Sequence, residues 1–367
     1  MSEEKKVSEG KLLYDPMFAK KPVLDWTDSE KGGIFGKSIV KKIIFIIVLL
    51  IAIGGSSFFS FNSISKEKYE FKQLDDGTYI MEAFNGQKVD TVLNIDYVRS
   101  ADGKADETKV VSAVRKYSTT GNDTLQFVFI GKDVKDIEKT SFFYCTSLSG
   151  IFVDDANENY MDIDGILYKK ENGVPTELVL CPQQYTRYMT ALSMGDSAPA
   201  TPADATNLAN KLLKEDYIAT LDKVIENEDT KVGKIITVPE TVTKICQLSF
   251  AYCDKLIEVK LPQGLKEIET MAFFDCEALK KADLPDTLEA IGSDAFSKCE
   301  SLDYIFIPAS VKNIGHHAFW ECKSAKKVYI AAENLNGIDA GANWIPQYRK
   351  SVMKDIETVF GAERGVK

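Results

Sequence analysis

Apolar residues recur at a fixed spacing of 23 positions through the C-terminal half of the chain. Each unit begins at a proline, and positions 3, 6, 11, 14, 17, 20 and 22 after it carry apolar side chains in nearly every copy. Position 11 is always phenylalanine and position 14 is always cysteine. The four units begin at Pro239, Pro262, Pro285 and Pro308.

One such unit buries too few side chains to offset the conformational entropy of ordering its own backbone. Units of this kind become stable when they stack and bury their apolar positions against each other, as in a solenoid. Positions 19 to 22 carry β-formers, Tyr304 to Ile307 in the third unit, so a short strand is expected there. Identical strands in successive turns predict one parallel sheet, with positions 3 to 6 forming the opposite wall.

A fifth unit begins at Gly131, with Phe142 and Cys145 at the phenylalanine and cysteine positions. It begins 108 residues before Pro239, which is not a multiple of 23, so an insertion is predicted over 154–230. Within this insertion, Thr201-Pro202 followed by Asp204 predicts the start of a helix over about 202–228.

The flanks of the repeats are predicted to cap them. Residues 69–94 favour a hairpin turning at Asp75-Asp76-Gly77, and 100–124 favour a loop with a short helix or strand near 110–117. After Ile330 the period stops, and 331–347, with Trp344, are expected to close the array. The repeat domain is thus placed at 69–347, followed by a helical tail over 348–367.

The combined pattern is Pro-x-x-Leu/Val-x-x-Ile, then Ala-Phe-x-x-Cys-x-x-Leu, then Val/Ile-x-Leu/Ile. It resembles the BspA-type leucine-rich-repeat surface proteins. Gly292 and Gly315 follow the isoleucine, where this family often has glycine, whereas Cys246 and Glu269 depart from it. The resemblance implies a leucine-rich-repeat solenoid of parallel β-sheet coils, of mixed α/β structure, at the cell surface.

A stretch without charge, residues 43–61, precedes the repeats. Its nineteen residues would span about 28 Å as a helix, close to the thickness of a bilayer core. Lys41 and Lys42 stand directly before it, which favours a cytoplasmic N-terminus. We therefore predict a flexible cytoplasmic tail (1–38), a single-pass signal anchor (39–61) in the cell membrane, and a repeat domain outside. A cleaved signal peptide, with Ala52-Ile53-Gly54 as the cleavage site, is the alternative.

Composition narrows the function. The net charge is −10, which disfavours nucleic acid as a partner. The seven cysteines include no Cys-x-x-Cys pair, and the two histidines are adjacent, so neither a zinc site nor a catalytic triad is expected. Five cysteines share one repeat position and should be small buried side chains. Cys181 and Cys246 lie outside that column, and a disulfide between them stays open.

Acidic residues near turns are candidates for calcium binding or for hydrolytic catalysis. Asp162, Asp164, Gly165 and Glu171 match part of a calcium-binding EF-hand loop, but Tyr160 stands at its first position. The surrounding residues favour strands, so a solvated hairpin turn is expected. The sequence therefore predicts no enzyme, no cofactor and no metal, with a hydrolase built around the insertion as the weaker alternative.

Positions 19 and 21 of each predicted strand point away from the core. We expect these side chains to form an exposed sheet face that binds a protein or glycan, as in adhesion or another cell-surface interaction. A structural or sensory role, in which the membrane span couples an outer ligand to the cytoplasmic tail, is the alternative. The predicted binding residues are Phe152, Lys260, Lys281, Tyr304, Phe306, Lys327 and Tyr329.

Overall fold

The computed structural model describes residues 68–85, 90–227, 229–345 and 357–364. The chain divides into two compact units, 1–66 and 67–367, and every description below concerns the second. The predicted tail (1–38) and membrane anchor (39–61) lie outside the described residues. Within the described ranges, the helices are all too short or too polar to cross a bilayer.

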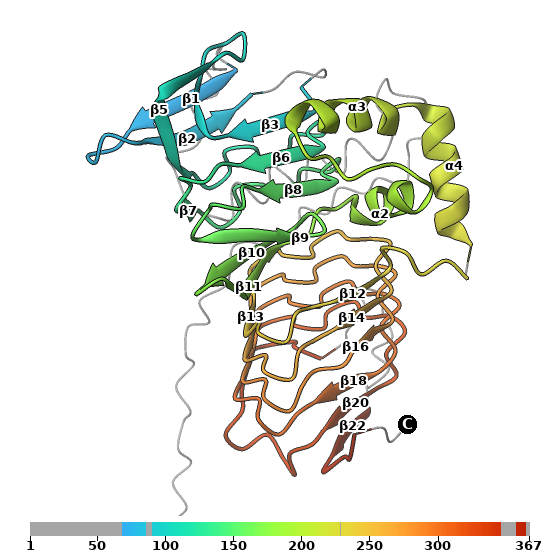
Figure 1. Cartoon of the computed structure of the whole chain (residues 1–367). Coiled ribbons are helices and arrows are strands. Elements are labelled where there is room, and N and C mark those ends of the chain that lie inside the picture. Colours follow the sequence, from blue (N-terminus) through green and yellow to red (C-terminus); the bar gives the residue numbers. More distant parts are fainter. Residues whose placement is uncertain (1–67, 86–89, 228, 346–356, 365–367) are drawn as a thin grey trace, which may run out of the picture. The chain divides into compact units, whose positions relative to one another are not determined.

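The first wall of the core is an eight-stranded sheet to which each repeat adds a two-residue rung (Figure 1). The isoleucine of each rung faces the core and is at most 2% exposed in Ile245, Ile268, Ile291 and Ile314. The first four rungs pair in parallel 23 residues apart, and the last, which carries Ala340 in place of isoleucine, pairs 26 residues after its neighbour. The rungs are β13 (Lys244–Ile245), β15 (Glu267–Ile268), β17 (Ala290–Ile291), β19 (Asn313–Ile314) and β21 (Asp339–Ala340).

The second wall contains the strands predicted at positions 19 to 22, and they pair in parallel as expected. It is divided into three sheets of three strands each. The first is β3 (Val92–Ile95), β6 (Phe127–Ile130) and β8 (Gly150–Val153). The others are β12 (Ile235–Thr237), β14 (Glu258–Lys260) and β16 (Lys281–Ala282), then β18 (Ile305–Ile307), β20 (Lys327–Ile330) and β22 (Glu357–Phe360).

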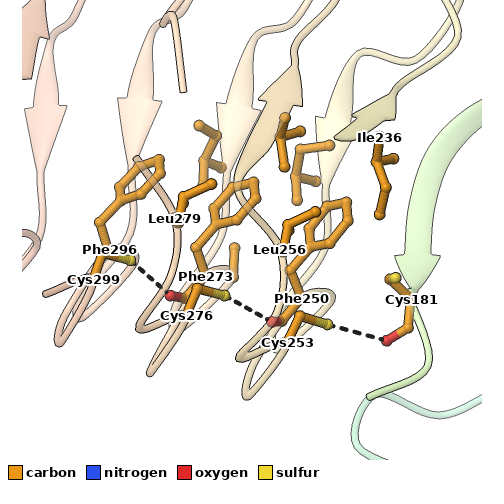
Figure 2. Close-up of a cluster of buried hydrophobic side chains, with 14 of the residues drawn as sticks. Cys181, Ile236, Phe250, Cys253, Leu256, Phe273, Cys276, Leu279, Phe296 and Cys299 are labelled. Atoms are coloured by element: carbon orange, nitrogen blue, oxygen red, sulfur yellow. Dashed lines mark hydrogen bonds between the residues drawn. The ribbon is translucent and has the colours of Figure 1, made fainter. Parts of the chain in front are cut away.

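Between the walls, the repeated phenylalanines form a stacked column (Figure 2). The ring centroids of Phe250, Phe273 and Phe296 are 4.8 Å apart at each step, with interplanar angles of 6°. Phe319 continues the column at 5.2 Å. The spacing matches the distance of about 4.8 Å between hydrogen-bonded strands, so the backbone ladder sets the ring stacking.

The cysteine column does more than fill space. Three of its thiols donate to the carbonyl oxygen of a phenylalanine one turn earlier: Cys276 to Phe250 at 3.0 Å, Cys299 to Phe273 at 3.1 Å and Cys322 to Phe296 at 3.2 Å. The first two are drawn in Figure 2. All seven cysteines are free and buried, so Cys181 and Cys246 are not joined. Burial raises the pKa of the Cys145 thiol to about 12, which keeps it protonated at neutral pH.

A five-stranded sheet precedes the regular turns. The predicted hairpin is confirmed as β1 and β2, and β2 then pairs in parallel with β5. The strands are β1 (Tyr69–Gln73), β2 (Tyr79–Phe84), β4 (Tyr97–Arg99), β5 (Ala105–Val114) and β7 (Asp136–Ile137).

The prediction for 100–124 is confirmed in one part, because the short strand expected near 110–117 overlaps β5 (Ala105–Val114). It is wrong in treating the segment as a loop outside the repeats. Residues 108–130 form one more turn, directly before the unit that begins at Gly131. Val111, Val114, Leu125 and Val128 are fully buried at the repeat's apolar positions. The sequence pattern missed this turn because polar side chains, Thr119 and Asn122, replace its phenylalanine and cysteine.

The insertion contains three helices rather than one: α2 (Tyr185–Ser193), α3 (Pro202–Leu212) and α4 (Glu215–Glu226). The predicted capping box of Thr201 and Asp204 is present at the start of α3. The single helix over 202–228 is wrong, because the chain turns at Lys214, whose backbone is extended. Leu212 and Leu221 are nine residues apart and would face opposite sides of one straight helix. The break allows both to enter the core, where they are 8% and 0% exposed.

A hairpin within the insertion extends the first wall, and a strand near the C-terminus extends the second. The hairpin of β10 (Ile166–Glu171) and β11 (Val174–Leu180), with β9 (Tyr160–Ile163), extends the first wall, since β11 pairs in parallel with β13. The helical tail over 348–367 is wrong for 357–360. These residues form β22, which gains a full ladder with β20 that a surface helix would lack.

Gly315 tests how closely successive turns approach. A Cβ atom there would lie 2.2 Å from the backbone nitrogen of Ser293 in the preceding turn. We expect Gly315→Ala to lower the free energy of unfolding by about 1–3 kcal/mol, because backbone cannot move aside as a flexible side chain can. Denaturant unfolding followed by circular dichroism would measure the change.

Gly264→Ala is the matched control, because its Cβ would meet only the carbonyl oxygen of Glu240, at 3.7 Å. This variant should unfold within about 0.5 kcal/mol of the wild type. Equal losses in both variants would contradict the assigned close approach.

Candidate ligand-binding site

The residues predicted to form an exposed sheet face do not make one open surface. Phe306 and Tyr329 are only 6% and 8% exposed, so their predicted exposure is wrong. Tyr304, 5.4 Å from Tyr329 between ring centroids, is half-buried. Phe152 is also half-buried, because it packs against Phe129 and against Tyr188 of α2.

Segments distant in the sequence cover these aromatic side chains. The guanidinium of Arg364 lies 4.8 Å from the ring centroid of Phe306 and pairs with Asp286 at 2.6 Å. Strand β22 lies beside β20, with Val359 opposite Tyr329. The aromatic residues therefore stabilise the end of the array instead of forming a free surface.

The remaining predicted residues of this face are lysines engaged in ion pairs or exposed to solvent. Lys281 pairs with Glu258 at 3.2 Å and with Asp283 at 3.1 Å. Lys327 pairs with Glu357 at 2.8 Å, and Lys260 is exposed. The charges of this sheet face are largely matched by ion pairs within the face itself.

Two hollows lie on the opposite wall. The larger, which we call the groove, has a volume of about 590 Å³ and crosses the rungs β15, β17, β19 and β21. Glycines after the rungs, Gly292, Gly315 and Gly341, leave its floor without side chains. Its walls are largely polar and include Glu267, Glu269, Thr270, Ser293, Asn313, His316 and Asp339.

The smaller hollow, which we call the cleft, has a volume of about 240 Å³ and lies between the loops 138–145 and 246–251. In the regular array such loops stack directly on each other, as when the Phe273 amide donates to the Ala295 carbonyl at 2.7 Å. The β10–β11 hairpin adds strands to the wall but no equivalent loop. The two loops therefore stand apart, and the space between them is the cleft.

Aromatic and aliphatic side chains line the interior of the cleft. They include Phe142, Phe143, Tyr144, Leu148, Val179 and Leu248. Tyr252 lies beside it, with its ring at 5.2 Å and nearly perpendicular to that of Tyr144. Charged side chains of Glu138, Lys169 and Glu177 also contribute to the lining.

An ion pair joins the groove and the cleft. Lys139 donates to both carboxylate oxygens of Glu269, at 2.7 and 2.9 Å, across 130 residues of sequence. The backbone amide of Gln247 donates to the same carboxylate at 2.8 Å. Lys139 and Gln247 line both hollows, so the two adjoin. Sequence reasoning missed this site although Lys139 and Gln247 share one repeat position, because the pattern does not show that the insertion separates their two loops.

Asp164 lies in the turn of the predicted hairpin, between β9 and β10, and Asp162 lies beside it in β9. Asp162 accepts hydrogen bonds from the amides of Val153 at 2.8 Å and Gly165 at 3.3 Å. Burial raises the pKa of the Asp162 carboxyl above its ordinary value. Across the described ranges, no group of three or more His, Cys, Asp or Glu side chains is arranged to hold a metal ion.

The two histidines have different surroundings. His316 Nδ1 accepts a hydrogen bond from the Ala342 amide at 3.0 Å. His317 packs its ring 5.1 Å from that of Trp320, nearly perpendicular to it. Their contacts are therefore with the loops of the last turns.

Residues 229–343 match the model of the BspA type leucine rich repeat region in six copies. These residues are BspA-type leucine-rich repeats. The match confirms the resemblance found in the sequence motifs, and no curated protein matches the chain.

Several solved structures are similar to this leucine-rich-repeat chain. The pneumococcal vaccine antigen PcpA is 18% identical over 70% of this chain, with a TM-score of 0.48; the chain spans 56% of that protein. A leucine rich cell surface protein from Faecalibacterium prausnitzii is 13% identical, covering 82% and 95% of the two chains, with a TM-score of 0.40. A leucine-rich repeat protein from Eubacterium ventriosum is 15% identical, covering 77% and 84%, with a TM-score of 0.41.

Asp162→Asn tests the cost of the buried carboxylate. The amide keeps an acceptor for the Val153 amide and loses only the longer hydrogen bond from Gly165, which offsets part of the gain from removing a buried charge. The variant should therefore be more stable than the wild type by no more than about 1 kcal/mol at pH 7. Because the pKa of Asp162 in the folded state lies above its ordinary 3.8, the folded wild type holds this proton more tightly than the unfolded chain does. Its stability therefore rises relative to the variant as the pH falls through the folded pKa.

Urea unfolding between pH 7 and pH 3.5 would follow this difference, which should shrink steadily as the pH is lowered. Asp164→Asn, at an exposed turn position with a φ of 53°, is the control, and asparagine tolerates this conformation. A difference that grows on acidification would contradict the assignment.

Proposed function

We propose that this chain is a membrane-anchored, extracytoplasmic leucine-rich-repeat protein that binds a protein or glycan at the cell surface. The observation that carries the proposal is the pair of adjoining hollows, the groove and the cleft, on the first wall. Together they span several turns and combine polar walls with an apolar recess, a combination that suits ligand binding. This moves the expected contact away from the lysine-bearing second wall.

The proposed membrane anchor rests on the sequence. Residues 43–61 are uncharged and follow three lysines at 37, 41 and 42. A cytoplasmic tail and an outer repeat domain follow from that orientation. Buried free thiols are compatible with an oxidising exterior, because all seven cysteines are shielded from solvent in the folded unit.

Orientation can be tested by treating intact cells with trypsin. With a tag before residue 1 and a second tag after residue 367, the C-terminal tag should be lost and the N-terminal tag retained. Permeabilised cells, in which both tags should be removed, are the control. Retention of the C-terminal tag in intact cells would place the repeats inside and contradict the proposal.

Binding can be tested with the full chain in detergent micelles on arrays of glycans and of extracellular proteins. We expect at least one specific signal, and we expect the double variant Asn313→Arg/Asp339→Arg to weaken it about tenfold or more, because two long side chains would fill the groove. Lys260→Glu/Lys281→Glu, on the second wall, is the matched control and should leave the signal unchanged. Loss of binding in the control alone would place the ligand on the other wall.

A further inference from the structure

We infer that the groove and the cleft together bind an extended, basic segment of a partner protein, with one large apolar side chain inserted in the cleft. This inference rests on the proposed binding function and names the chemistry of its ligand. Four observations carry it: the length of the groove, the charge of its lining, the apolar interior of the cleft, and the ion pair between them.

The groove has the dimensions of a short extended peptide. It crosses four rungs, β15, β17, β19 and β21, which are three strand spacings of about 4.8 Å, or roughly 14 Å in all. An extended chain advances about 3.3 Å per residue, so four residues fit along it. Because Lys139 and Gln247 line both hollows, the cleft lies within reach of the next residue of the same segment.

The lining of the two hollows is acidic. Six carboxylates line them, against Lys139 and Lys169 in the lining and Lys244 beside it. Lys139 is already engaged by Glu269, and the Lys244 ammonium lies 3.6 Å from Glu177 and 3.7 Å from Glu269. Among the described residues, no ion pair engages Glu267 or Asp339. Such a surface attracts cationic segments and repels acidic ones. The six acids are Asp136, Glu138, Glu177, Glu267, Glu269 and Asp339.

The interior of the cleft favours an apolar side chain. Phe142 and Phe143 are 5% exposed and form part of its surface, together with the half-buried ring of Tyr144. An apolar or aromatic group that enters would lose its hydration and contact these rings. By contrast, none of the described residues that line the groove is phenylalanine, tyrosine or tryptophan, which disfavours a glycan stacked along it.

The Lys139–Glu269 ion pair lies where the groove meets the cleft. The Glu269 side chain is 13% exposed, and its carboxylate is held by Lys139, by the backbone amide of Gln247 and, at 3.7 Å, by Lys244. A cationic ligand at this junction competes with Lys139 for Glu269. Removing Lys139 should therefore strengthen binding, whereas removing the charge of Glu269 should weaken it.

A selection with random linear dodecapeptides displayed on phage, on the full chain in detergent micelles, would test this. We expect enriched peptides to carry one large apolar residue beside two or more Lys or Arg. A fluorescein-labelled copy of the most enriched peptide would then be titrated by fluorescence anisotropy. Lys139→Met should bind it about threefold or more tightly, and Glu269→Gln about threefold or more weakly.

Opposite effects from the two members of one ion pair distinguish ligand contact from simple destabilisation, which would weaken binding in both. Glu258→Gln, which removes an acid of the second wall paired with Lys281, is the matched control and should bind as the wild type does. The anisotropy should also fall with Glu267→Gln/Asp339→Asn.

Enrichment of acidic peptides, no enrichment at all, or equal weakening by Lys139→Met and Glu269→Gln would overturn the inference. A glycan or folded-protein signal on the arrays, with no peptide enriched, would leave the proposed function standing and remove this inference alone. No signal in either experiment would remove both.

Discussion

The fold depends on one constraint: every turn must place the same side chains over those of the turn before. The phenylalanine rings at 4.8 Å and the thiol–carbonyl hydrogen bonds meet this requirement inside. Outside, ion pairs such as Glu289–Lys312, at 2.9 Å, join residues 23 positions apart. Each exposed pair contributes little to stability, but a shift in register would misalign them together with the core. The glycines after the rungs reflect the same constraint, because successive backbones approach too closely there for a Cβ atom.

The cleft arises where this regularity is interrupted, whereas the groove lies along the regular rungs. The β10–β11 hairpin continues the first wall while omitting one loop, which opens the cleft without breaking the sheet. On the second wall, the same insertion supplies helices that fill the interruption between β8 and β12, and Tyr188 and Leu221 complete the core there. The insertion therefore preserves the stability of the array and creates a recess on its surface. Figure 1 shows the hairpin on one side of the stacked turns and the helices on the other.

Prediction from the sequence succeeded where one residue type repeats in register. The parallel strands, the buried phenylalanines and cysteines, the hairpin at Asp75–Gly77 and the capping box at Thr201 followed from local pattern. It failed where tertiary contacts replace the pattern. Residues 108–130 fold as a turn because their neighbours supply the stacking surface, although Thr119 stands in place of phenylalanine. Helix α2 carries Tyr185, Thr186, Tyr188 and Thr190 on its buried side, so no simple apolar stripe marks it.

The sequence by itself determined the solenoid, because a 23-residue period leaves apolar positions that only stacking can bury. It also determined which residues face inward, since strand alternation is a local property. Only the tertiary structure decided which outward faces are free. Arg364 covers Phe306 from 58 positions away, and Lys139 reaches Glu269 across 130. Exposure depends on whichever distant segment packs against a surface, and a repeat pattern contains no information about segments that do not repeat.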